Sequence, residues 1–334
     1  MARDHDCSAS RRRFWLSAGA VLAAPRIALA QGSTKIRRIG ALTAGLPDGP
    51  EVLSKQAEPL RQLGWVEGQN LQVERRYDNG RPAALQPLAE ELVRANVEII
   101  VTLGTSATLA AKRATTTIPI VFFVGDAVLT GVVGSLSRPG GNATGYSDAS
   151  PEVTAKQLSL LKEFVPQLQR IGMLWEAGNP FNRSYRAQFE RVCESLRLVP
   201  IIVEIDAAPE IELGIEELVR QRAQALVMPS NALVNDHDVE IAHAAMKHRL
   251  PTITDEAERV RERTGVLIAY SSTWAEQFRR RAEYIDRILR GAKPSELPVQ
   301  QPTKFELVID LRTARALGLT IPKKLLLRAD EVIQ

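Results

Sequence analysis

The sequence predicts an α/β fold with two doubly wound parallel sheets. Short apolar runs that end in Gly, Pro or Asp alternate with segments of helical period along most of the chain. The alternation starts again after a Gly/Pro-rich cluster at 138–145, and 334 residues exceed what one hydrophobic core usually organises. Two lobes, each with its own sheet covered by helices, are therefore the expected architecture.

The first thirty residues have the pattern of an export signal. Ser10 to Phe14 match the twin-arginine pattern S-R-R-x-F, and Ala28-Leu29-Ala30 forms an A-x-A cleavage site. The run from Trp15 to Ala30 is too short and too polar to remain as a membrane span. We expect residues 1–30 to be a twin-arginine signal peptide that is cleaved near Ala30, which predicts a periplasmic protein.

The charge balance and the cysteine content argue against nucleic-acid binding and against a reactive thiol. The full sequence has 43 basic and 39 acidic residues, a formal charge of +4. Most of this excess lies in the first thirty residues, because the remainder has 38 basic and 37 acidic residues. This balance gives no electrostatic footprint for nucleic-acid binding. Cys193 is the single cysteine after the leader, and its apolar helical surroundings predict a core residue rather than a reactive thiol.

The first half of the chain contains a series of strand and helix patterns. The runs Glu98 to Thr102 and Ile120 to Val124 are β-branched and uninterrupted, as is typical of strands buried on both faces of a parallel sheet. Strands are expected at 36–42, 71–77, 98–102 and 120–124, and helices at 53–63, 84–95 and 105–111, with a short helix after Gly131.

The second half repeats the alternation. Strands are expected at 170–175, 200–204, 225–228, 251–254, 265–270 and 304–309, and helices at 153–164, 181–197, 210–221, 234–249 and 274–289, with a terminal helix that ends near Leu317. On helix 274–289, Trp274 and Phe278 are predicted on the buried side. The run Arg279 to Arg281 is interpreted as a solvated face, because acidic residues share the helix.

No catalytic or metal motif occurs in the chain. The patterns G-x-S-x-G, H-E-x-x-H, C-x-x-C and G-x-x-x-x-G-K-[ST] are absent. His237, His243 and His248 fall in one predicted helix with a spacing that does not stack them around a metal. The run Gly140 to Gly145 resembles a phosphate loop only loosely, because it does not join a strand to a helix. We therefore expect no catalytic residue, no metal and no cofactor.

Polar residues gather instead where the predicted strands end. Parallel strands present their carboxyl ends at one edge of a sheet, where open α/β sheets bind ligands. Thr105 and Ser106 could hold a carboxylate at a helix amino end, and Asp126 could hold an ammonium group. For each residue the alternative is that it only caps its helix. The candidate ligand-binding residues are Thr43, Gly104, Thr105, Ser106, Asp126, Ser147, Asn179, Pro180, Ser230, Asn231, Asp255 and Tyr270.

Three long segments resemble a known family. They are GTSATLAAKRATTTIPIVFFVGDAVLTGVVGSLSRPGGNATGYS, LRQLGWVEGQNLQVERRY and LPVQQPTKFELVIDLRTARALGLTIPKKLLLRADEVIQ. They are similar to exported substrate-binding proteins of ABC importers, in particular the periplasmic binding family related to tryptophan-binding transport proteins. The resemblance covers about residues 35–334. It implies a periplasmic binding protein type I clamshell, in which hinge strands join the lobes, a ligand lies between them and no catalysis occurs.

The resemblance also implies a domain organisation and partners. Lobe one is expected to comprise residues 35–147 plus 266–296, and lobe two residues 148–265 plus 297–334. We expect a monomer that binds a small polar or carboxylated, amino-acid-like solute and delivers it to an ABC permease of the inner membrane. Two alternatives stay open: a periplasmic ligand-sensing module for a membrane receptor, and a hydrolase that uses Ser106.

Overall fold

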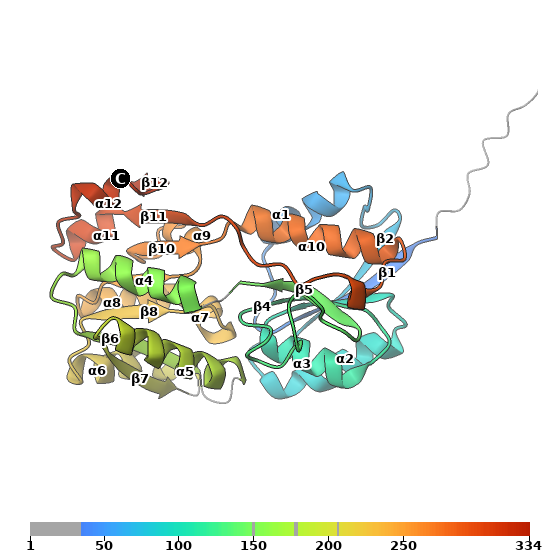
Figure 1. Ribbon diagram of the computed structural model, residues 1–334, viewed down its shortest axis with the longest axis horizontal. Coiled ribbons are helices and arrows are strands. Elements are labelled where there is room, and N and C mark those ends of the chain that lie inside the picture. Colours follow the sequence, from blue (N-terminus) through green and yellow to red (C-terminus); the bar gives the residue numbers. More distant parts are fainter. Residues whose placement is uncertain (1–34, 149–150, 177–179, 206) are drawn as a thin grey trace, which may run out of the picture. The chain divides into compact units, whose positions relative to one another are not determined.

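The computed structural model describes residues 35–148, 151–176, 180–205 and 207–334. Residues 35–334 form one compact unit. It contains two sheets, one of five and one of seven strands, each with helices on both faces (Figure 1). The chain therefore has the two-lobed α/β fold that the sequence predicts.

The first lobe is built on a sheet in which every pairing is parallel, in the order β2-β1-β3-β4-β5. Helices α2 and α3 cover one face, and α1 and α10 cover the other (Figure 1). The elements are β1 (Arg37–Thr43), α1 (Pro50–Gln62), β2 (Leu71–Tyr77), η1 (Pro82–Ala84), α2 (Leu85–Arg94), β3 (Ile99–Leu103), α3 (Thr105–Ala114), β4 (Ile120–Val124), β5 (Ala143–Ser147), α10 (Trp274–Leu289) and η3 (Pro294–Glu296).

The second lobe is built on a sheet in the order β12-β11-β10-β9-β8-β6-β7, in which β10 and β11 are antiparallel. Helices α4, α5, α11 and α12 pack on one face, and α6, α8 and α9 on the other. The elements are α4 (Pro151–Phe164), β6 (Arg170–Glu176), α5 (Pro180–Ser195), β7 (Val199–Ile205), η2 (Ala208–Glu210), α6 (Ile211–Arg220), β8 (Ala225–Met228), α7 (Ala232–Asp236), α8 (Asp238–Lys247), β9 (Thr252–Thr254), α9 (Ala257–Arg261), β10 (Ile268–Ser271), β11 (Glu306–Asp310), α11 (Leu311–Ala316), α12 (Lys323–Leu326) and β12 (Glu331–Ile333).

The chain passes between the lobes three times: between β5 and α4, between β10 and α10, and between η3 and β11. The last passage runs beside β5, where Ser147 N–H donates to Gln300 O at 2.9 Å and Gln300 N–H donates to Gly145 O at 3.0 Å. Residues 297–300 thus lie against the first lobe, whereas the prediction gave them to the second.

The boundary at the second passage also differs from the prediction, which placed residues 266–271 in the first lobe. Strand β10 pairs with β9 and β11 in the seven-stranded sheet, and its Ile268 and Ala269 are fully buried between helices of the second lobe. The sheet that a buried strand joins depends on distant partners, so the local pattern could not assign it.

Four local predictions were wrong in detail. Residues 131–138 form turns rather than a short helix, and residues 143–147 form the fifth strand of the first sheet. The predicted helix 234–249 is divided at His237, whose backbone is not helical, into α7 and α8. Helices α9 and α12 and strand β12 were not predicted. Cys193 is fully buried in the core of the second lobe, as predicted.

Candidate functional site

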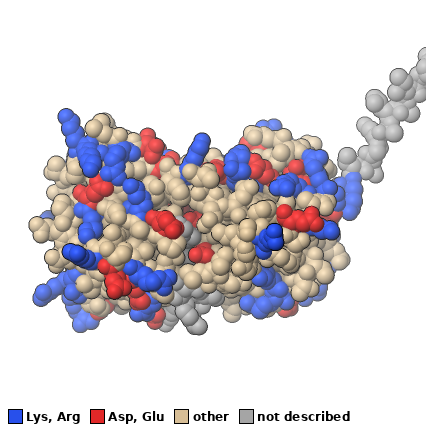
Figure 2. Space-filling model, viewed as in Figure 1, with Lys and Arg blue, Asp and Glu red and all other residues tan. Residues whose placement is uncertain are grey.

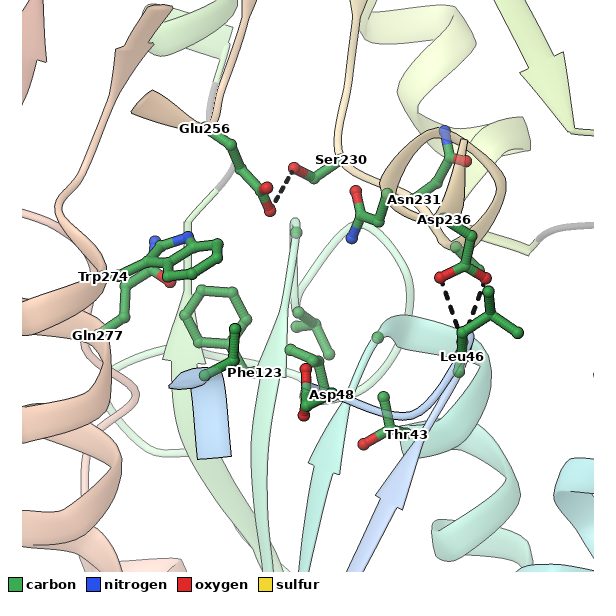
Figure 3. Close-up of a pocket in the computed structure, with 18 of the residues that line it drawn as sticks. Thr43, Leu46, Asp48, Phe123, Ser230, Asn231, Asp236, Glu256, Trp274 and Gln277 are labelled. Carbon is green, nitrogen blue, oxygen red and sulfur yellow. Dashed lines mark hydrogen bonds between the residues drawn. The ribbon is translucent and has the colours of Figure 1, made fainter. Parts of the chain in front are cut away.

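A cavity of about 450 Å³ lies between the carboxyl ends of the strands of the two sheets (Figure 3). From the first lobe it is lined by the residues that follow β1, β2, β3 and β4 and by one side of α10. From the second lobe it is lined by the residues that follow β8 and β9 and by α7 and α9. This is the edge at which open parallel sheets bind ligands.

The turn after β3 brings the first backbone N–H groups of helix α3 to the first-lobe wall. Gly104 has φ +93° and a Cβ there would lie 3.2 Å from the Cβ of Ala44, so both its conformation and the limited space favour glycine. Helix α3 begins directly afterwards, with Thr105 and Ser106 in its first turn. The N–H groups of a first turn have no acceptor within the helix, and here they belong to residues that line the cavity.

Aromatic side chains form part of the same wall. Phe123, at the end of β4, stacks on Tyr146 with ring centroids 5.3 Å apart and an interplanar angle of 12°. Trp274 and Phe278 of α10 lie 5.8 Å apart. Figure 3 shows the rings of Trp274 and Phe123 pointing into the cavity, opposite Ser230 and Asn231.

One side of α10 faces the cavity along two turns of the helix. Trp274, Gln277, Phe278 and Arg281 line the cavity, and their spacing of three, four and seven residues places them on one face of a helix. The prediction had placed Trp274 and Phe278 in the core with Ile285 and Ile288. The structure buries Ile285 and Ile288 against the sheet and leaves the amino-terminal half of α10 to the cavity.

A pair of carboxyl groups surrounds Ser230 in the second-lobe wall. The Ser230 hydroxyl lies 2.6 Å from Oδ1 of Asp255 and 3.1 Å from Oε1 of Glu256. A hydroxyl has one proton to donate, so it cannot satisfy both carboxylates at once. Burial raises the pKa of Glu256 above its usual range, and the guanidinium of Arg259, 3.3 Å from Oε2, opposes this shift only in part.

Arg259 and Asn231 hold the polar groups of this wall in place. Arg259 is 2% exposed, donates to Oγ1 of Thr254 at 2.8 Å and also bonds to Oδ1 of Asn235. Asn231 caps α7 by accepting the N–H of Val234 at 3.0 Å. These side chains therefore serve the local structure as well as lining the cavity.

A hydrogen bond joins the two walls at the rim. The backbone N–H of Leu46, in the loop after β1, donates to Oδ1 and Oδ2 of Asp236 at 3.1 and 3.2 Å (Figure 3). Asp236 ends α7 in the second lobe. Burial raises the pKa of Asp236, and the neighbouring carboxylates of Asp78 and Asp48 act in the same direction. The bond belongs to the arrangement in which the lobes are together.

The cavity is acidic although basic and acidic residues are almost balanced in residues 31–334. Among the described residues, nine lining side chains carry a carboxyl group and two carry a guanidinium group, Arg259 and Arg281. On the face shown in Figure 2, by contrast, basic and acidic side chains are interspersed over both lobes. The nine acidic residues are Asp48, Asp78, Asp148, Asp236, Asp238, Asp255, Glu256, Glu258 and Glu262.

The structure brings seven of the twelve predicted site residues into this cavity: Thr43, Gly104, Thr105, Ser106, Ser230, Asn231 and Asp255. The remaining five are placed elsewhere or not described. Asn179 lies outside the described residues, and Pro180 is the first residue of α5.

Three of these residues have other contacts. The carboxylate of Asp126 accepts the N–H groups of Val128 and Leu129 at 3.0 and 2.9 Å and so caps its own turn. Ser147 is buried and bonds to the backbone of Gly125 and Ala127. Tyr270 stacks on Phe305, with centroids 5.3 Å apart, and lines a separate cavity of about 210 Å³.

Within the described part of the chain, one group of side chains has a geometry that could hold a metal ion. Ligand atoms of Glu212, Glu216 and His248 lie within 4.8 Å of one another, away from the cavity between the sheets. Glu212 already pairs with Lys247 there. A search of the described helices for one long and apolar enough to cross a membrane found none.

Comparisons with known proteins identify the family. The family model "ABC transporter substrate binding protein" matches residues 53–333. A tyrosine-binding protein of Clostridioides difficile (strain R20291) is 24% identical over 261 residues, which are 78% of this chain and 74% of that protein.

Solved structures share the fold. A conserved domain protein from Vibrio cholerae superposes with a TM-score of 0.83 at 24% identity and covers 89% of this chain and 100% of its own. An ABC domain from Streptococcus pneumonia in complex with L-Trp gives a TM-score of 0.80 at 22% identity, with 89% and 99% covered. Together with the family match, these observations show that the chain belongs to the ABC transporter substrate-binding proteins, a family of solute-binding proteins with the periplasmic binding protein type I fold.

Proposed function

We propose that this protein binds an amino acid with an aromatic side chain in the cavity between its lobes and delivers it to a membrane permease. The observation that carries this proposal is the lining of the cavity, in which aromatic rings accompany charged groups of both signs. A volume of about 450 Å³ lies within the usual range of roughly 300–1,000 Å³ for small-molecule sites. The relatives named for tyrosine and solved with L-Trp point to the same ligand class.

The charges of the cavity favour a ligand with an ammonium group. Asp255 also accepts the backbone N–H of Ser230 at 3.0 Å, and Glu256 pairs with Arg259 at 3.3 Å. The single proton of the Ser230 hydroxyl reaches only one of the two carboxylates at a time, so an ammonium group of a ligand would add a charged hydrogen bond to this pair. The ring of Trp274 lies on the Glu256 side of the cavity in Figure 3 and could contact a cation through its face. A ligand with negative charge alone would meet repulsion from the nine acidic residues that the structure describes around the cavity.

Binding is expected to use lobe closure. The two walls belong to different sheets joined by three passages, and the Leu46–Asp236 bond exists only while the walls are together. Hinge closure of this kind buries a ligand and creates a form that a permease can distinguish from the open one. No histidine is among the described residues that line the cavity, so Ser106 has no imidazole base there for hydrolysis.

Export completes the proposal. The twin-arginine pattern in residues 10–14 and the A-x-A site at 28–30 support cleavage near Ala30 and a periplasmic location. Expression of the full chain in a bacterium, with and without Arg11→Lys and Arg12→Lys, tests this part. Only the form with the intact arginine pair should be shortened and periplasmic; unprocessed wild-type protein in the cytoplasm would contradict this part of the proposal.

A thermal-shift screen of the purified protein against the L-amino acids, aromatic acids and sugars tests the ligand class. At a concentration near 100 times the dissociation constant, a ligand stabilises the protein by about 2.7 kcal/mol, so tyrosine or tryptophan should raise the melting temperature by roughly 5–10 °C. Sugars and dicarboxylates should give no shift. A shift with sugars but none with any amino acid would overturn the proposal.

Two phenylalanines offer a matched control. Phe123 and Phe305 each stack on a tyrosine with centroids 5.3 Å apart and an interplanar angle of 12°, but Phe123 lines the main cavity and Phe305 the separate one. By titration calorimetry, Phe123→Ala should weaken binding of the aromatic amino acid by about tenfold or more. Phe305→Ala should leave the affinity unchanged.

A further inference from the structure

Helix α10 carries three consecutive arginines, and the third differs from the other two. Arg279 pairs with Glu283, and Arg280 lies 3.7 Å from Glu276 and 3.4 Å from Glu283. Arg281 makes no ion pair or hydrogen bond in the part of the chain that the structure describes. Its guanidinium carbon instead lies 5.1 Å from the centre of the Phe278 ring. The interpretation of this run as a solvated face therefore fails at Arg281.

Arg281 lies where two cavities meet. Besides the main cavity, it lines an adjoining cavity of about 70 Å³ that extends between α1, α10 and the first sheet. Thr43, Asp48, Gln56 and Leu103 line both cavities as well. A group that enters the main cavity and reaches its first-lobe end thus meets the guanidinium of Arg281.

The second arginine of the main cavity is already engaged. Arg259 donates to Thr254 and Asn235 and pairs with Glu256 at 3.3 Å and Asp238 at 3.6 Å. Among the described residues that line the cavity, Arg281 is therefore the cation whose N–H donors have no hydrogen-bond acceptor.

The charge state of Arg281 agrees with a role in binding an anion. Burial lowers the pKa of Arg281 to about 10, and the negative charge of Asp48, which acts to raise the pKa, offsets this shift only in part. The group stays cationic at neutral pH. A cation that has lost part of its water and has no ion-pair partner among the described residues is unfavourable, and an incoming carboxylate would relieve this cost.

We infer that Arg281 binds the carboxylate group of the ligand, and this inference rests on the proposed function. A guanidinium presents paired N–H donors that match the two oxygens of a carboxylate. Because the described residues that line the cavity include one cation without an ionic partner and nine acidic residues, the cavity accepts a single carboxylate on a ligand that also carries an ammonium group. Amines without the carboxylate and dicarboxylic acids are both excluded from tight binding.

The test removes the carboxylate from the ligand and the guanidinium from the protein, separately and together. L-Tyrosine is compared with tyramine, and L-tryptophan with tryptamine, by titration calorimetry on wild type, Arg281→Gln, Arg281→Lys and Arg279→Gln. Wild type and Arg279→Gln should bind the amino acid about 30-fold or more tightly than the amine. In Arg281→Gln the two should bind within about threefold, and Arg281→Lys should fall between because it lacks the paired donors.

The outcomes separate the inference from the proposed function. If wild type binds tyrosine or tryptophan but Arg281→Gln keeps the wild-type preference over the amine, the inference is wrong and the proposed function stands. If wild type binds none of the four compounds, the proposed function fails and the inference fails with it.

A stability measurement on the ligand-free proteins tests whether the role of Arg281 is purely structural. Arg281→Gln removes an unpaired charge, so its melting temperature without ligand should equal or exceed that of wild type. A clear fall in the melting temperature of Arg281→Gln, with Arg279→Gln unaffected, would assign Arg281 to the fold and overturn the inference.

Discussion

Gly145 permits the close approach of strands β4 and β5, and replacing it should be costly. Its φ of +155° turns the Cβ position toward the paired strand, where an added Cβ would lie 2.0 Å from O and 2.7 Å from N of Phe122. Real Cβ atoms essentially never approach other heavy atoms within 3.0 Å, so the two strands would have to separate. The neighbouring Phe123 and Tyr146, stacked across the same pair of strands, would move with them.

The magnitude follows from two separate costs. An unfavourable backbone conformation costs about 1–3 kcal/mol, and overpacking a buried position typically costs about 1–3 kcal/mol more. Gly145→Ala should therefore lower the free energy of unfolding by about 2–6 kcal/mol. At roughly 2–4 °C for each kcal/mol in a domain of this size, the melting temperature should fall by roughly 5–20 °C.

Two other glycines separate these costs. Gly140 has φ +65° but nothing within 4 Å of an added Cβ, so Gly140→Ala carries the backbone cost alone, about 1–2 kcal/mol. Gly134 has neither a positive φ nor a neighbour within 4 Å, and Gly134→Ala should change stability by less than about 0.5 kcal/mol.

The three variants are compared by thermal unfolding followed by circular dichroism, with urea denaturation as a second measure. The loss of stability should increase in the order Gly134, Gly140, Gly145. Equal losses in Gly140→Ala and Gly145→Ala would refute the argument, because they would show that the strands absorb the added Cβ without cost.

Three further predictions concern the second lobe. Asp236→Ala removes the acceptor of the Leu46 N–H, so calorimetry should show binding of the amino acid weakened by about three- to tenfold, whereas Asp236→Asn keeps an acceptor and should stay within about twofold. Equal effects of the two changes would contradict a role for the hydrogen bond. Burial raises the pKa of the Cys193 thiol to about 12, so a disulfide reagent should label it only after denaturation; rapid labelling of the native protein would place it outside the core. Because burial raises the folded-state pKa of Glu256, its contribution to stability is present below about pH 4.5 and is lost as the pH rises through the raised value. Melting temperatures between about pH 5 and pH 8 should therefore decline less in Glu256→Gln than in wild type, and parallel curves would show that Glu256 is not the group responsible.

Sequence patterns were sufficient to predict a structural element wherever the residues of the segment themselves determine its conformation and burial. The apolar runs at 98–102 and 120–124 became β3 and β4, side by side in the first sheet, because only strands buried on both faces tolerate such uninterrupted apolar residues. The turn at Gly104 also lies at the predicted edge of the sheet, since strand direction and helix start are both encoded locally.

The sequence was insufficient to predict the role of a residue where contacts between segments determine that role. Asp126 has the residue type of a ligand-binding group, but its own turn supplies two N–H donors and turns the carboxylate to a capping role. Nothing local distinguishes the two roles. The spacing of Trp274, Phe278 and Arg281 showed that these residues share one face of a helix. Apolar residues at that spacing more often belong to a hydrophobic core, and the local sequence does not reveal that this face lines the cavity between the lobes.

The three passages between the lobes also affect how the protein can be made. Helix α10 closes one face of the first sheet through Tyr284, Ile285, Ile288 and Leu289, although it follows most of the second lobe in the chain. A nascent polypeptide that has emerged only as far as β5 thus exposes the apolar face formed by Ile39, Val101 and Val121. The first lobe is therefore complete only when residues up to 289 have been synthesised, after most of the second lobe.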